Sequence, residues 1–216
     1  MENAAKCRFQ SRKYRTMKRE NQMKIGRMFI NDNYKGTRDY LKTQKNYEIA
    51  RTVLYFAISA SLFAAGWITT GSRENLLTIV AVLGCLPACK SAVDMIMYLR
   101  YKGCSNENAE VIAPHAQGLF CLYDMVFTSY EKTYNVAHIT VCDNTICGFT
   151  QSEKFDEQAF YKHMDSVLKK DGYKETSIKI FKDIKKYTQR LDQMQELEVH
   201  EEFTEGILGT MKSVSL

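Results

Sequence analysis

Two charged residues lie inside an otherwise apolar run of the chain, and they are the first candidates for chemistry. Lys90 and Asp94 are four residues apart, so on a helix they share one face. Within a membrane, such residues would form either an ion pair in a conduction path or two snorkelling side chains near the headgroups. Both interpretations stay open, and the first of them predicts an oligomeric pore or transporter.

A second group of candidate residues combines one histidine with two cysteines. His138, Cys142 and Cys147 fall on one face of a β-hairpin predicted around the Asp143-Asn144 turn. Ligands of these types suit zinc, but no fourth ligand is evident and the spacing matches no zinc pattern. We therefore expect core packing at this face and assign no metal, no cofactor and no catalytic residue.

The sequence has no Walker A loop and no GxGxxG, HExxH, GxSxG or EF-hand pattern. The expected order of helix, hairpin, helix and strand is similar to the core of restriction-endonuclease-like enzymes. That resemblance implies an acidic residue early in the hairpin and an (Asp/Glu)-x-Lys triplet on the next strand, which together hold a metal. Here the two positions fall near His138 and at Gly148-Phe149-Thr150-Gln151. The analogy therefore implies a degenerate, nuclease-related fold, and a membrane-bound enzyme stays as an alternative.

Two apolar segments contain Lys90 and Asp94 or precede the predicted β-hairpin, and they determine where these candidate residues lie. Residues 52–70 carry no charge and, as a helix, would span about 28 Å, close to the thickness of a bilayer core. Residues 76–99 form a second segment, which contains Pro87 as well as Lys90 and Asp94. We expect a two-helix transmembrane hairpin, with residues 37–51 continuing as a helix into the first span.

Small residues recur every four positions in both apolar segments, a pattern that lets helix backbones approach closely. The residues are Ala57, Ser61 and Ala65 in the first segment and Gly84, Ala88 and Ala92 in the second. We expect the two stripes to pack on each other within the hairpin. A contact between copies of the chain, which would make a homo-oligomer, is the alternative.

Charge is distributed unevenly over the 216 residues, whose net charge is +5. Residues 1–51 hold 14 Lys or Arg and 5 Asp or Glu, whereas residues 99–216 hold 14 and 18. By the positive-inside rule, this predicts a multi-pass protein of the cell membrane with both termini in the cytoplasm. We expect the basic segment to bind anionic lipid headgroups rather than nucleic acid, because the membrane lies beside it. The residues expected to face lipid are Arg12, Lys13, Arg15, Lys18, Arg19, Lys24 and Arg27.

Residues 105–202 are long enough for one small cytosolic α+β domain, followed by a tail over residues 203–216. Ser105 is expected to cap a helix running towards Tyr130, with an apolar stripe that includes Leu119 and Phe127. The hairpin follows with Val141 facing Ile146, and helix, strand and helix complete an α-β-β-α-β-α order. We expect the tail to be weakly ordered.

Three segments resemble an uncharacterised family of two-span membrane proteins from clostridial-type bacteria. They are INDNYKGTRDYL, AGWITTGSRENLLTIVAVLGCLPACKSAVDMIMYLRYK and DMVFTSYEK, and the resemblance covers most of the chain. It implies no established activity. A glycosyltransferase-like label goes with such proteins, but the sequence does not support it, because the domain is short and lacks a DxD-type pair.

These observations favour a membrane-anchored scaffold or regulatory protein over an enzyme. In this interpretation, the hairpin holds a small α+β binding domain at the inner membrane face. The domain would bind a protein partner or a ligand. The membrane-bound, nuclease-related enzyme and the oligomeric pore that uses Lys90 and Asp94 are the two alternatives.

Overall fold

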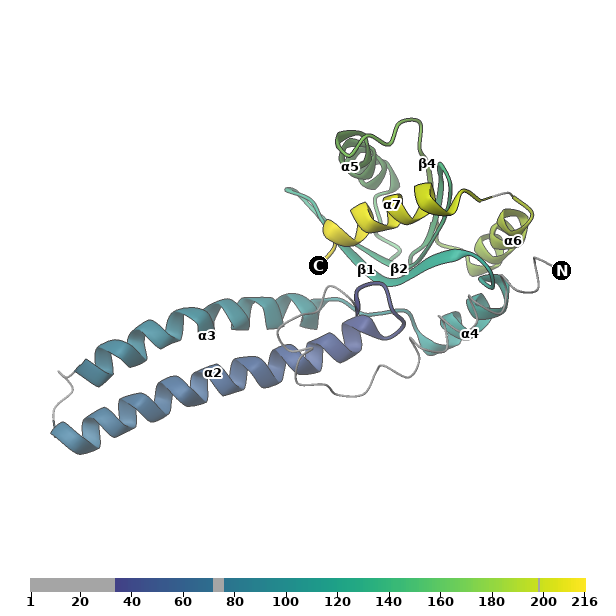
Figure 1. Cartoon of the computed structure of the whole chain (residues 1–216). Helices are drawn as coiled ribbons and strands as arrows, with labels where there is room; N and C mark the ends of the chain where they lie inside the picture. Colours follow the sequence, from purple (N-terminus) through teal and green to yellow (C-terminus); the bar gives the residue numbers. More distant parts are fainter. Residues whose placement is uncertain (1–33, 72–75, 198) are drawn as a thin grey trace. The chain divides into compact units, whose positions relative to one another are not determined.

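The computed structural model describes residues 34–71, 76–197 and 199–216 of the chain. It shows a mixed α+β protein with two long apolar helices and a four-stranded sheet (Figure 1). The chain divides into two compact units. Residues 41–101 make the first unit, which we call the hairpin unit, and residues 34–40 with 102–216 make the second, the α+β unit.

The hairpin unit consists of two long helices, α2 (Tyr40–Thr70) and α3 (Leu76–Arg100). As expected, α2 is continuous from the residues before the first apolar segment to the end of that segment. Both helices are long and apolar enough to cross a membrane. Pro87 lies inside α3, where the loss of one backbone hydrogen bond is tolerated in membrane helices.

The contact between α2 and α3 follows a spacing of seven residues. The buried residues Thr52, Ser59 and Gly66 of α2 are spaced in this way, as are Ala81 and Ala88 of α3. This is the repeat of helices that cross at a shallow angle, because 3.5 residues per turn keep one seam facing the partner. Small residues on the seam allow the two helices to approach closely.

The predicted packing stripe is therefore wrong for the first helix. Ala57, Ser61 and Ala65 are exposed on α2, because a spacing of four drifts around the helix and away from the seam. The stripe on α3 is partly right. Ala88 is fully buried, a Cβ on Gly84 would approach Ser59 Oγ to 3.0 Å, and Ala92 lies at the margin of the contact.

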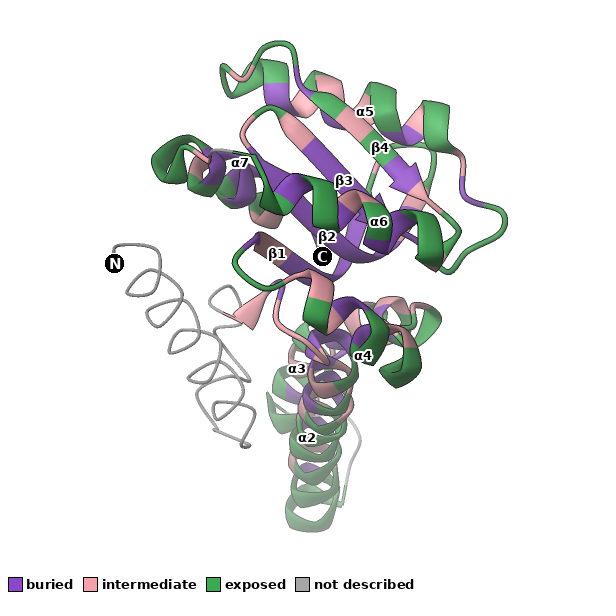
Figure 2. Cartoon of the chain, turned by 90° about the vertical axis from the view of Figure 1, so that its right-hand side faces the viewer, coloured by how far each residue is buried: buried purple, intermediate pink, exposed green. Residues whose placement is uncertain are grey.

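The α+β unit is built on a mixed sheet with helices on both faces (Figure 2). Strands β1, β2 and β3 pair antiparallel, and β4 then pairs parallel with β3, which gives the order β1-β2-β3-β4. The strands are β1 (Phe120–Thr128), β2 (Thr133–Cys142), β3 (Thr145–Phe149) and β4 (Ser177–Phe181). The helices are α4 (Asn106–His115), α5 (Glu157–Lys170), α6 (Ile184–Gln195) and α7 (Glu201–Ser213).

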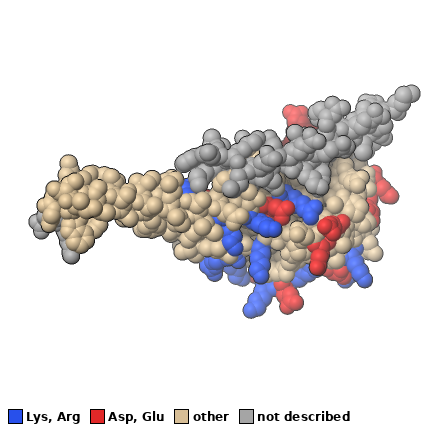
Figure 3. All heavy atoms as spheres, turned by 90° about the horizontal axis from the view of Figure 1, so that it is seen from below, with Lys and Arg blue, Asp and Glu red and all other residues tan. Residues whose placement is uncertain are grey.

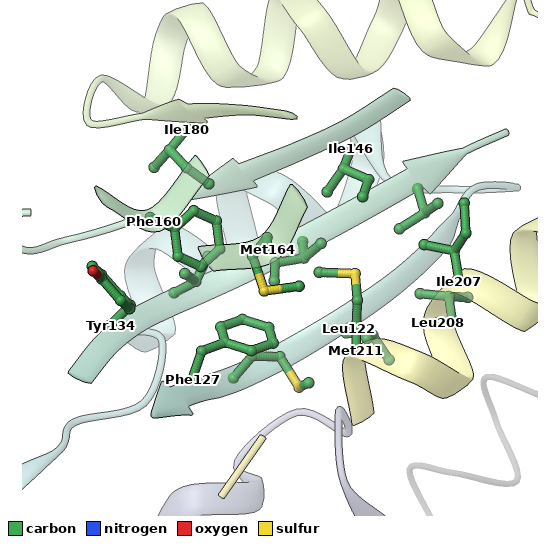
Figure 4. Close-up of a cluster of buried hydrophobic side chains, with 14 of the residues drawn as sticks. Leu122, Phe127, Tyr134, Ile146, Phe160, Met164, Ile180, Ile207, Leu208 and Met211 are labelled. Atoms are coloured by element: carbon green, nitrogen blue, oxygen red, sulfur yellow. The ribbon is translucent and has the colours of Figure 1, made fainter. Parts of the chain in front are cut away.

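The register of β2 and β3 divides the core into two layers. Val141 pairs with Ile146, as the two-residue turn predicts, and both side chains pack in the layer of α5 and α7. Figure 4 shows this layer, in which Phe160 and Met164 of α5 lie over the sheet together with Met211 of α7. Cys142, Cys147 and Phe149 lie on the other face, which α4 and α6 cover.

Two expectations about this unit are wrong. The helix that starts at Ser105 ends at His115, and the apolar residues from Leu122 to Phe127 belong to strand β1 instead. Gly118 has a φ of +83°, which redirects the chain between the two elements. The segment from Phe203 onward is not a loose tail, because most of it forms α7 and buries Ile207 and Met211 in the core.

The outer edge of β1 is covered by two segments that are distant in sequence. The N–H of Tyr123 donates to the carbonyl of Gly36, and the N–H of Leu216 donates to the carbonyl of Val126. Gly36 has a φ of +81°, and a Cβ there would clash with Leu122, so this close approach requires glycine. The α+β unit therefore includes residues that precede the hairpin unit.

Candidate functional site

A chain of hydrogen bonds joins buried polar side chains of the sheet to α6 in the core of the α+β unit. His138 Nδ1 lies 2.6 Å from the hydroxyl of Tyr187, which lies 3.2 Å from Thr140 Oγ1. Thr140 Oγ1 in turn lies 3.4 Å from Cys121 Sγ. Tyr123 and Phe149 enclose the group with ring contacts to His138 and Tyr187, respectively. We call these four hydrogen-bonding residues the His138 network.

Burial keeps the His138 network uncharged. It lowers the pKa of His138 to about 3 and raises the pKa of Cys121 to about 12. Burial also raises the pKa of Tyr187 well above its ordinary value. A general acid or base needs a pKa near the working pH, so at neutral pH this group can exchange hydrogen bonds but is poorly suited to proton transfer.

The histidine and the two cysteines of the predicted hairpin face do lie on one face, but they form no site. Burial raises the pKa of Cys142 and of Cys147, although Arg190 lies close enough to Cys147 to oppose the shift. Metal ligation by cysteine requires the thiolate, which burial disfavours. Among the described residues, no group of three His, Cys, Asp or Glu side chains could hold a metal ion.

The positions that correspond to the nuclease-like carboxylates carry no acid. His138 is part of the buried network, and Thr150 is buried, where its hydroxyl donates to the carbonyl of Asn135 at 2.8 Å. The backbone N–H of Ser152 also donates to Thr150 Oγ1. Glu153 and Lys154 follow on the exposed surface, beyond the end of β3.

Asp124 is a buried carboxylate that the sequence analysis did not single out. It lies within β1 with a φ of +55° and accepts a 2.7 Å hydrogen bond from the backbone N–H of Cys104. A Cβ on Gly103 would approach its Oδ2 to 2.8 Å, so the chain before α4 passes directly over the carboxylate. A buried aspartate with a positive φ would have been the signal, but neither property is visible in sequence.

The hairpin unit contains a polar cluster that joins α2 to α3. Arg51 bonds through its guanidinium to Glu48 on its own helix and reaches Asp94 Oδ2 of α3 at 3.4 Å. Arg51 Nε also donates to Ser91 Oγ at 3.2 Å, and Ser91 lies 2.9 Å from Thr52 Oγ1. The structure thus gives Asp94 a partner from the other helix, while Lys90 is exposed.

The rest of the hairpin surface is apolar and uncovered. Only 17% of the most apolar window of each helix is buried, and Ile68 of α2 and Leu76 of α3 are 84% and 76% exposed. Among the described residues at the closed end of the hairpin, the face visible in Figure 3 shows no Lys, Arg, Asp or Glu. The core helix of a soluble protein buries most of such a surface.

The seven basic residues expected to face lipid, from Arg12 to Arg27, lie outside the described residues. The comparisons with known proteins add no relative. No family model, no curated protein and no solved structure matches this chain. The membership of a two-span family therefore stays a prediction, and the function has to be argued from the two units alone.

Proposed function

We propose that this protein is a membrane-anchored scaffold or regulatory protein, whose α+β unit is a binding module held at the inner membrane face. One observation carries the proposal, namely the exposed apolar surface along α2 and α3. Exposed apolar area costs about 25 cal/mol per Å² in water, whereas lipid chains accept it without cost. The bilayer is the environment that suits this surface.

The polar cluster supports a membrane hairpin with both open ends in the cytoplasm. Arg51, Glu48 and Asp94 belong to the ends of the helices that connect to the rest of the chain, where charged groups reach headgroups and water. Basic residues are abundant beside those ends, and this favours the cytoplasmic side. Anionic headgroups are the lipid partners that the basic segment would attract.

A binding role for the α+β unit is supported by the chemistry of its interior. The His138 network is uncharged and enclosed, and the nuclease-like positions hold Thr150 and His138 instead of carboxylates. An oligomeric pore is less favoured, because Asp94 is engaged by Arg51 within one hairpin. We therefore propose recognition at the surface of this unit rather than catalysis within it.

The test is whether the exposed apolar face of the hairpin unit inserts into membranes. Wild-type protein should stay with the membranes when they are washed at alkaline pH. Ile58→Arg places a charge in the middle of the first span, so we expect this variant to be released by the wash. Val111→Arg is the matched control, because Val111 in α4 has a similar exposure, 47% against 49% for Ile58. A wild-type chain found in the soluble fraction without detergent would contradict the proposal.

Topology requires a separate measurement. A reporter that is active only outside the cytoplasm should work when it is fused after Gly71 and fail when it is fused after Leu216. The opposite pattern, or activity at neither position, would overturn the proposed orientation.

A further inference from the structure

The outer edge of β4 is open. β4 is the last strand in the sheet order, and its described pairing is with β3 alone. On that side, the N–H of Ser177 donates to Asn144 and the carbonyl of Phe181 accepts from Thr150. In a parallel ladder, alternate residues bond to the same side, so the N–H and C=O groups of Ile178 and Ile180 point outward.

This edge differs from the opposite one. Gly36 and Leu216 bond to the main chain of β1, whereas no backbone hydrogen bond from another described segment reaches Ile178 or Ile180 on their outer side. An open edge of this kind is a template for one more strand. The two faces of β4 then determine which side chains such a strand would carry.

On the α6 face, the edge is basic. Lys179 is exposed, lies over the ring of Phe181 at 5.3 Å, and pairs across the ladder with Cys147. Arg190 from α6 also reaches Cys147, so the two cations lie on the same part of this face. Residues 174–186 hold five lysines against Glu175 and Asp183, which leaves a net charge of +3 around the strand.

On the α5 face, the edge is apolar. Ile180 is buried in the core layer of α5, and Ile178 is only partly covered there. A strand added to β4 would place every second side chain beside Ile178 and the others beside Lys179. The edge therefore favours a segment in which apolar and acidic residues alternate.

We propose that β4 binds an extended segment of a partner protein in which acidic residues alternate with apolar ones, as a fifth strand of the sheet. Main-chain bonds to Ile178 and Ile180 would hold the segment, and its acidic side chains would face Lys179 and Arg190. The inference rests on the proposed function, because it names the partner class of the binding module.

A second copy of the chain fits this edge poorly. Antiparallel pairing of β4 with itself about a two-fold axis through its central residue would place Lys179 opposite Lys179, and like charges directly opposite are destabilising. Lysine on an edge strand also protects against such self-association. An acidic side chain on the added strand would instead be attracted to Lys179.

The experiment uses the full chain in neutral detergent and a fluorescent heptapeptide in which Glu alternates with Val. Fluorescence polarisation should show saturable binding. Lys179→Glu should weaken it by at least about fivefold, since an attractive cross-strand pair becomes a repulsive one. Lys102→Glu is the charge-matched control, because the carbonyl of Lys102 bonds to Asn135 of β2, two strands away from β4, and binding should not change.

Methylated peptides separate strand addition from simple charge attraction. N-methylation of all Val residues blocks one edge of the peptide, and N-methylation of all Glu residues blocks the other. One of the two should lose binding and the other should keep it. Equal binding of both peptides, or equal weakening by Lys102→Glu, would mean that the basic surface attracts any anion, lipid headgroups included, and would overturn the proposal.

Failure of this inference is distinguishable from failure of the proposed function. Peptide binding is measured in detergent and does not depend on where the protein lies in the cell. No binding by a chain that fractionates with membranes overturns the β4 edge as a docking site and leaves the anchor. Binding by a chain that is soluble in cells overturns the anchor and leaves the docking site.

Discussion

The carboxylate of Asp143, at the turn between β2 and β3, is bonded to His200, the N-cap residue of α7, which lies 57 positions later in the chain. Asp143 Oδ1 accepts a 2.8 Å hydrogen bond from the backbone N–H of His200, and its Oδ2 lies 2.9 Å from His200 Nδ1. Thr204 adds a bond from its hydroxyl to the same carboxylate and accepts one from the Asp143 N–H. His200 itself makes no side-chain cap of α7, so Asp143 holds the start of that helix.

Removal of the Asp143 carboxylate should loosen α7. Asp143→Ala should lower the free energy of unfolding by about 1–2 kcal/mol, the size of a lost helix cap in a favourable dipole position. Asp143→Asn should cost less, because asparagine tolerates the φ of +48° and keeps one acceptor oxygen. Faster hydrogen exchange of the α7 amides would report the change. Asp165→Ala, which removes an exposed pair with Lys169, is the control, and an equal effect there would contradict the cap.

The free energy of unfolding should decrease when the pH is lowered below about 6.5, before the carboxylates become protonated. Burial lowers the pKa of His138 to about 3 from an ordinary value of 6.5, so the folded protein holds this ring neutral where the unfolded chain binds a proton. The contribution of the neutral His138 ring to the free energy of unfolding is complete above pH 6.5. It is lost as the pH falls towards 3, with a slope of up to about 1.4 kcal/mol per pH unit. Denaturant unfolding at several pH values measures it. A His138→Gln variant should have a smaller slope between pH 6.5 and 4.5, where His163, whose pKa burial also lowers, still contributes, and an unchanged slope would refute the assignment.

The close approach of α2 and α3 should depend on Gly84. A Cβ there already comes within 3.0 Å of Ser59 Oγ, so Gly84→Leu should push the helices apart and lower the melting temperature in detergent. Ala57→Leu is the matched control, because Ala57 is exposed on α2 and the larger side chain meets no neighbour in the hairpin. A large effect of Ala57→Leu, together with a change of oligomeric state, would instead indicate that the outer stripe contacts a second copy.

The hydroxyl of Tyr187 should make a large contribution to the free energy of unfolding, because it is the buried partner of His138. Tyr187→Phe leaves His138 Nδ1 without its 2.6 Å partner in a fully buried position, which should cost about 1–3 kcal/mol. Tyr161→Phe removes a hydroxyl from an exposed ring and should be close to neutral. Urea unfolding monitored by near-ultraviolet circular dichroism compares the two. Equal midpoints for both variants would show that the network is not stabilising.

The parts of the fold that follow from local chemistry could be predicted from sequence. The Asp143-Asn144 turn determines the pairing of Val141 with Ile146, and Ser105 caps α4 through its side chain as expected. Strand β1 could not be recognised, because both of its faces are buried and a continuous apolar run is compatible with a helix. Helix α7 could not be recognised for a different reason, because its two glycines have a low helix propensity.

The candidate sites were less accessible to sequence reasoning, because their partners are distant in the chain. The sequence places His138 and the two cysteines on one face, as the structure does, but it does not identify Tyr187 of α6 as the partner of His138. The spacing of Asp94 and Lys90 predicts either an ion pair on one helix or two snorkelling side chains, whereas the structure gives Asp94 a partner, Arg51, from the other helix. The seam between the helices determines that partner, and it follows the spacing of seven residues rather than four.

The hydrogen bond from Tyr123 to Gly36 joins chain segments made before and after the hairpin, and this has a consequence for biosynthesis. The N-terminal portion of the α+β unit must wait during translation until both long helices and β1 have been made. If only one of the two helices crossed a bilayer, Gly36 and Tyr123 would lie on opposite sides and the β1 edge could not close. Completion of the sheet is therefore compatible with two helices that both cross a bilayer or with two that both stay out of it, and it excludes a chain in which only one has crossed.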